Sequence, residues 1–145
     1  MKKIILFALA CGLYGQVTPL VINPGDTKCT GVMQSDPAWS QDIVFQTVQV
    51  AQRMTCKITV KPGLYNIVIR AQEPLTSAFV GMRVFNVTVN GLTVSNVDLF
   101  KLAVGAQIPY EIDILVTVQN QLTITFEATT RTALWSQILI QPNGQ

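Results

Sequence analysis

The chain has no histidine, few aromatic residues and few charges. Of its 145 residues, 8% are aromatic and 12% are charged. Without histidine there is no imidazole to act as a general base or a metal ligand, and no serine lies in a nucleophile-elbow motif. No spacing of acidic residues indicates a glycosidase pair, and Glu111 and Asp113 are two apart, as on a solvated strand face. We therefore expect no catalytic residues, no metal and no cofactor.

The first 15 residues have the pattern of a secretory signal peptide. Lys2 and Lys3 precede an apolar stretch, residues 4–10, which is too short for a transmembrane helix. We expect cleavage before Gln16 and a mature domain at residues 16–145. Ala8-Leu9-Ala10-Cys11 is an alternative, because it is similar to a bacterial lipoprotein box that would place a lipid on Cys11. The signal peptide predicts a secreted or periplasmic protein, and the alternative predicts a lipoprotein anchored at Cys11.

The mature chain is short and formally neutral. Its roughly 130 residues suit a single domain. Without Lys2 and Lys3, eight basic residues remain against eight acidic ones. Nucleic acids and anionic membranes require a concentrated basic surface, so we expect neither as a partner.

Two of the three cysteines remain after the predicted cleavage. Cys29 and Cys56 lie 27 positions apart, and an even number of cysteines in an exported protein favours a disulfide. We predict that they pair. On the chain-entropy account, this bond stabilises the fold by about 3–4 kcal/mol.

Residues 81–98 contain the clearest local structure. Phe85, Val87 and Val89 alternate with polar residues, which is typical of a half-buried strand. Asn90-Gly91 supplies the two positive φ angles of a type I′ turn, and a return strand follows. We predict a β-hairpin here.

Further alternating segments indicate strands along most of the mature chain. They occupy residues 44–50, 55–61, 64–71, 111–118, 122–128 and 134–141. Tyr65 and Phe85 fall on the inward faces. Residues 26–42, 72–83 and 98–105 are expected to be irregular. About eight strands without a crossover helix predict an all-β fold, an antiparallel two-sheet β-sandwich of jelly-roll type.

Several motifs follow one another in an order found in one family. They are Ile22-Asn23-Pro24-Gly25, Trp39 with Asp42, Phe45-x-Thr47, Pro62-Gly63-Leu64-Tyr65 with Gln72-Glu73, the hairpin, Val97-Asp98-Leu99 and Gln121 to Phe126. This order resembles the malectin-like carbohydrate-binding domains. Asn86 stands where that family usually has Asp. The resemblance implies a β-sandwich and a sugar-binding activity.

A sugar site needs an aromatic face beside amides or carboxylates, presented on rigidly held loops. The aromatic candidates outside strand interiors are Trp39, Phe79 and Tyr110. The polar candidates are Asp42, Glu73 and Arg83.

Structural roles compete with binding at several of these positions. Trp39 fits a lid over one end of the sandwich, and Glu73 and Arg83 fit an ion pair that fixes their loop. Asp98 fits a turn or capping residue. Asn86-Val87-Thr88 matches a glycosylation acceptor, but we expect no glycan there because it lies within a strand.

The sequence predicts a secreted, non-catalytic carbohydrate-binding module for a glucose-type or related oligosaccharide. The site would lie in loops near Trp39, Asp42 and Phe79. The alternative is a structural or adhesive envelope protein that binds another protein through a sheet edge or loops.

Overall fold

The computed structural model describes residues 19–143, which contain eleven strands and three short helices. The predicted signal peptide, residues 1–15, and Cys11 lie outside the described residues. The strands form two four-stranded sheets and one three-stranded sheet, and every pairing is antiparallel. The predicted all-β antiparallel sandwich is confirmed.

The three sheets have the following spatial orders. The first is β1 (Leu20–Ile22), β11 (Gln137–Pro142), β5 (Gly63–Ala71) and β8 (Tyr110–Val118). The second is β4 (Arg53–Thr59), β9 (Gln121–Thr130), β6 (Val84–Val89) and β7 (Leu92–Val97). The third is β10 (Ala133–Trp135), β3 (Thr47–Ala51) and β2 (Val32–Ser35). The helices are η2 (Pro37–Trp39), η3 (Ile43–Gln46) and α1 (Leu99–Ala103).

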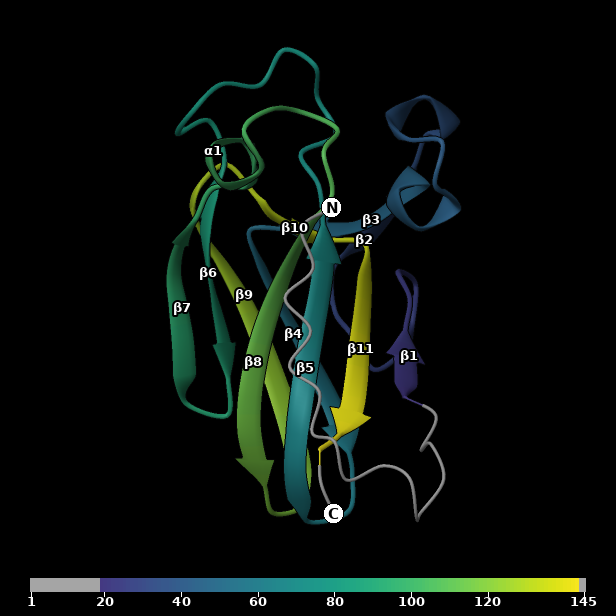
Figure 1. Cartoon of the computed structure of the whole chain (residues 1–145), viewed down its shortest axis with the longest axis vertical. Helices are drawn as coiled ribbons and strands as arrows, with labels where there is room; N and C mark the ends of the chain where they lie inside the picture. The colour runs from purple at the N-terminus through teal and green to yellow at the C-terminus, as the bar shows by residue number, and fades with distance from the viewer. Residues whose placement is uncertain (1–18, 144–145) are drawn as a thin grey trace.

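The core lies between the two four-stranded sheets (Figure 1). Strands β8, β9 and β6 bury alternate residues, as their sequence period requires, and β5 buries Val68 of its other face as well. Tyr65 and Phe85 are buried, as predicted. Phe126 stacks on Trp135 with ring centroids 6.1 Å apart, so β10 contributes to the same core.

The hairpin of β6 and β7 is confirmed. Asn90 and Gly91 have φ angles of 44° and 89°, the positive values of a type I′ turn. The Asn90 side chain also accepts a hydrogen bond from the Thr123 amide and donates one to the Gln121 carbonyl, at 2.7 and 3.1 Å. These two bonds join the turn to β9.

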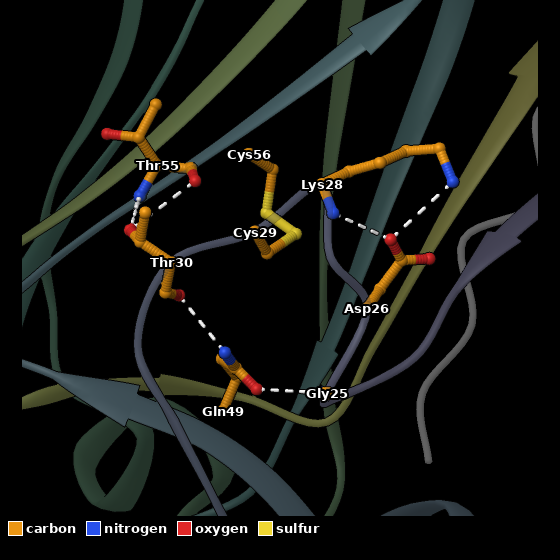
Figure 2. Close-up of a disulfide and its surroundings, with 8 residues drawn as sticks. All are labelled: Gly25, Asp26, Lys28, Cys29, Thr30, Gln49, Thr55 and Cys56. Atoms are coloured by element: carbon orange, nitrogen blue, oxygen red, sulfur yellow. Dashed lines mark hydrogen bonds and ion pairs between the residues drawn. A yellow bond between two sulfur atoms is a disulfide. The ribbon is translucent and has the colours of Figure 1, made fainter.

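The predicted disulfide between Cys29 and Cys56 is present (Figure 2). It joins the loop between β1 and β2 to the buried side of β4. Gln49 supports the same loop, because its side chain accepts from the Gly25 amide and donates to the Thr30 carbonyl, at 2.9 and 3.1 Å. The loop is therefore attached to two different sheets.

Four segments differ from the sequence prediction. Strand β2 lies within residues 26–42, which were expected to be irregular, and residues 43–46 form η3 where a strand was expected from residue 44. The connector after Asp98 contains α1. The last strand is interrupted at Ser136, so β10 and β11 belong to different sheets.

Candidate functional site

Three irregular segments gather at one end of the sandwich. They are residues 36–46 with η2 and η3, residues 72–83 after β5, and residues 98–109 with α1. Figure 1 shows them beyond the upper end of β5. We call this group the loop end.

A buried ion pair closes the base of the 72–83 segment. Glu73 and Arg83, at its two ends, are 2.7 Å apart (Oε2 to Nε), and their side chains are 1% and 8% exposed. Glu73 Oε1 accepts from the Leu75 amide at 3.2 Å, and Arg83 Nη1 donates to the carbonyl and hydroxyl oxygens of Thr132. The sequence leaves two alternatives for Glu73 and Arg83, contact with a ligand or an ion pair that fixes their loop. The ion pair is present in the structure.

Further bonds connect this segment to residues 98–109. Asp98 accepts from the Lys101 amide as the N-cap of α1, and its second oxygen accepts from the Gly81 amide at 2.6 Å. Gln107 donates its backbone amide to the Glu73 carbonyl at 2.7 Å and its side-chain amide to the Pro74 carbonyl. The capping role predicted for Asp98 is confirmed.

The tip of the 72–83 segment presents two apolar side chains. Phe79 and Val80 are 60% and 59% exposed. A hydrogen bond from the Met82 amide to the Phe79 carbonyl forms the turn. The tip is thus an apolar projection on a base that is fixed by buried polar contacts.

Trp39 and Asp42 lie in the 36–46 segment. Trp39 is half-buried against the core, and its carbonyl accepts from the buried Gln72 side chain at 2.7 Å. Asp42 is exposed and caps η3 by accepting from the Val44 amide at 3.0 Å. Trp39 therefore covers part of the core, while one Asp42 oxygen has a local structural role.

Tyr110 is half-buried at the start of β8, opposite Ala71 of β5. It lines a cleft between β7 and β8, and this cleft does not include Phe79, Trp39 or Asp42. The structure thus brings Glu73 and Arg83 into contact and places Trp39, Asp42 and Phe79 in segments of the loop end. It places Tyr110 in a separate cleft.

Sequence reasoning missed other exposed apolar residues of the loop end. Val80, Val104 and Ile108 are all exposed. Val104 is 85% exposed and adopts a left-handed conformation, φ 61°, which is unusual for a β-branched residue. Val80 and Val104 have a signal in the sequence, an apolar residue beside glycine outside any alternating strand, as in Val80-Gly81 and Val104-Gly105. Ile108 lies between Gln107 and Pro109 and has no such signal.

The fold is that of a malectin-like domain, and the chain belongs to this family. The family model for the malectin domain matches residues 26–141. The resemblance noted in the sequence is therefore confirmed. A comparison with curated protein sequences found no match.

Solved structures with similar folds include the plant receptor-like kinase FER, with a TM-score of 0.68 and 15% identity over 79% of this chain and 40% of that chain. A complex of plant peptide RALF23 with FER and LLG2 gives a TM-score of 0.66 and 14% identity over 77% and 39%. A Bacteroides uniformis β-glucuronidase gives 0.67 and 16% over 79% and 14%. This chain thus spans less than half of each, and the likeness shows the fold alone.

Within residues 19–143, no helix is long and apolar enough to cross a bilayer.

Proposed function

We propose that this malectin domain is a secreted, non-catalytic module that binds a glucose-type or related oligosaccharide at the loop end. The observation that carries this proposal is the exposed Phe79 ring on a segment whose base is fixed by the buried Glu73 and Arg83 pair. An aromatic ring on a rigid support can stack on the apolar face of a pyranose with little loss of conformational entropy.

The polar groups needed for sugar hydroxyls are also available at the loop end. Asp42 is an exposed carboxylate, and the indole of Trp39 is partly exposed in the same segment. Glu73 and Arg83 support the site from beneath rather than contacting the ligand, because each is buried in bonds within the protein. The disulfide supports an oxidising, extracytoplasmic location.

A glycan array of the mature chain from Gln16 tests this proposal. We expect binding that is lost in Phe79→Ala and weakened in Trp39→Ala. Val32→Ala is the matched control, because Val32 is similarly exposed but lies on β2, outside the loop end.

Phe79→Ala removes an exposed side chain, so it should leave the fold intact, which circular dichroism and the melting temperature verify. Folded protein without binding to any glycan would contradict the proposal. Equal loss of binding in Phe79→Ala and Val32→Ala would place the site elsewhere.

Protein binding is the second candidate function. It is favoured by the aliphatic character of the loop end, where Val80, Val104 and Ile108 are exposed, and by the complex of FER with a peptide and LLG2. Strand β2 has an exposed edge with Val32 and Met33, which suits strand addition. Val104→Gly separates the candidates, because it should weaken a protein contact at the loop end and leave sugar stacking on Phe79 unchanged.

A further inference from the structure

A cleft lies on the flank of the sandwich, separate from Phe79 and the 36–46 segment. It has a volume of about 310 Å³ and runs between β7 and β8, the edge strands of the two four-stranded sheets. Leu102 of α1 also lines it. Figure 1 shows β7 and β8 on the same flank, with α1 above them.

The floor of the cleft is apolar because part of the inner face of β7 is uncovered. Val94 and Leu92 are paired with Val87 and Val89, so they point to the same side of the sheet as these core residues. Val87 and Val89 are fully buried, whereas Val94 and Leu92 are 37% and 50% exposed, and of these two Val94 lines the cleft. The opposite sheet ends at β8. The inner-face side chains of β7 that continue the core pattern therefore have no strand opposite them.

A β-bulge changes the direction of the side chains at the rim. Ser95 and Asn96 of β7 lie opposite the single residue Asn86 of β6. Asn96 has φ 58°, and its backbone amide donates to the Asn86 side-chain oxygen at 2.9 Å. The extra residue lets Val97 return to the core while Ser95 and Asn96 line the cleft. Bulges are frequent beside binding sites because they redirect side chains in this way.

The opposite wall, from β8, adds an aromatic ring. Tyr110 is half-buried and Ile112 continues the apolar floor. Glu111 and Asp113 alternate with these residues, so their side chains point to the other face of β8, where Arg70 Nε holds the Glu111 carboxylate at 3.0 Å. The cleft therefore combines an apolar floor with the hydroxyl groups of Ser95 and Tyr110 and the amide of Asn96.

From this geometry we propose that the β7–β8 cleft is a second binding site, for one ring of a neutral sugar. A pyranose has an apolar face and a rim of hydroxyls, which match the floor and the polar groups of the cleft. A volume near the lower limit of small-molecule sites, about 300 Å³, suits a single ring. An added β-strand suits the cleft less well, because the bulge interrupts the outer edge of β7.

Nuclear magnetic resonance titration of the mature chain tests the second site. The probes are glucose, galactose, mannose and N-acetylglucosamine, each added up to millimolar concentrations. We expect at least one of them to shift the amide signals of residues 94–97 and 110–113 saturably. Phe79→Ala should leave these shifts unchanged, so this site and the loop-end site can fail independently.

Two variants and one control define the residues of the second site. Asn96→Gly keeps the left-handed backbone without strain and removes the amide, so it should weaken binding about threefold to tenfold. Val94→Glu places a charge on the floor and should abolish binding. Leu115→Glu adds the same charge at an exposed position of β8 outside the cleft and should have no effect.

The result that would overturn the proposal is the absence of saturable shifts at the cleft with all four sugars. Cleft shifts that persist in both Asn96→Gly and Val94→Glu would overturn it equally. Shifts confined to residues 72–83 would support the loop-end site and refute the second one.

Discussion

Replacing Arg83 by Met should be among the most destabilising single changes in the 72–83 segment. The substitution keeps the aliphatic stem and removes the guanidinium group, leaving the Glu73 carboxylate, which is 1% exposed, without its 2.7 Å partner. Removing one member of a buried ion pair typically costs about 3–5 kcal/mol, because the remaining charge is uncompensated. The Thr132 carbonyl also loses its donor.

Urea denaturation followed by tryptophan fluorescence measures this cost, since Trp135 is fully buried. For an m-value of about 2 kcal/mol/M, the midpoint should fall by about 1.5–2.5 M. The double variant Glu73→Gln/Arg83→Met should be more stable than Arg83→Met alone, because it removes the buried charge and retains an acceptor for the Leu75 amide.

Arg53→Met is the matched control for burial. Arg53 and Glu127 are also 2.7 Å apart, but their side chains are 64% and 59% exposed. Exposed ion pairs contribute about 0–1 kcal/mol, so this variant should unfold almost as the wild type does. The reasoning is refuted if Arg83→Met costs less than 1 kcal/mol, or if the double variant is less stable than the single one.

Three further changes probe the disulfide and the two ends of α1. Replacing Cys29 and Cys56 together by Ala should lower the free energy of unfolding, measured in urea, by about 3–4 kcal/mol. A reductant should lower the free energy of unfolding of the wild type by the same amount and leave that of the double variant unchanged. Asp98→Ala should cost about 1–2 kcal/mol in the same assay, whereas Asp98→Asn, which keeps an acceptor for the Lys101 amide, should cost less. Val104→Gly should raise the melting temperature, because it relieves about 1 kcal/mol of left-handed strain; no increase would contradict a strained cap.

The elements predicted correctly from sequence are those whose signal is local. The β6–β7 hairpin combines strict alternation with Asn90-Gly91, and β5 and β8 each bury one face of a long strand. The disulfide followed from cysteine number and predicted compartment. These patterns depend on nearest neighbours and on one buried face, which a single sequence records directly.

The missed elements depend on partners far away in the chain. All four residues of β2 are exposed, so no alternation marks it, and it exists because it pairs with β3. Helix α1, with five residues, is too short to show a helical period. The break at Ser136 follows from the tertiary fold, because β10 pairs with β3 and β11 with β5.

The candidate site also has parts that the sequence predicts and parts that depend on distant segments. The contact between Glu73 and Arg83 was anticipated from their positions at the two ends of one loop. The cleft at Tyr110 was not, since it needs the edges of two sheets and a bulge at Asn96, which the hairpin pattern alone does not reveal.

The residues that identify the family in this sequence are largely those that build the frame of the domain. The Tyr65 hydroxyl donates to the Lys61 carbonyl at 2.7 Å, Glu73 pairs with Arg83, and Asp98 caps α1 and holds Gly81. Family membership therefore reports how the domain is built rather than what it binds. Because the frame fixes both ends of the 72–83 segment, its tip can change without disturbing the core, and specificity is expected to depend on exposed residues such as Phe79.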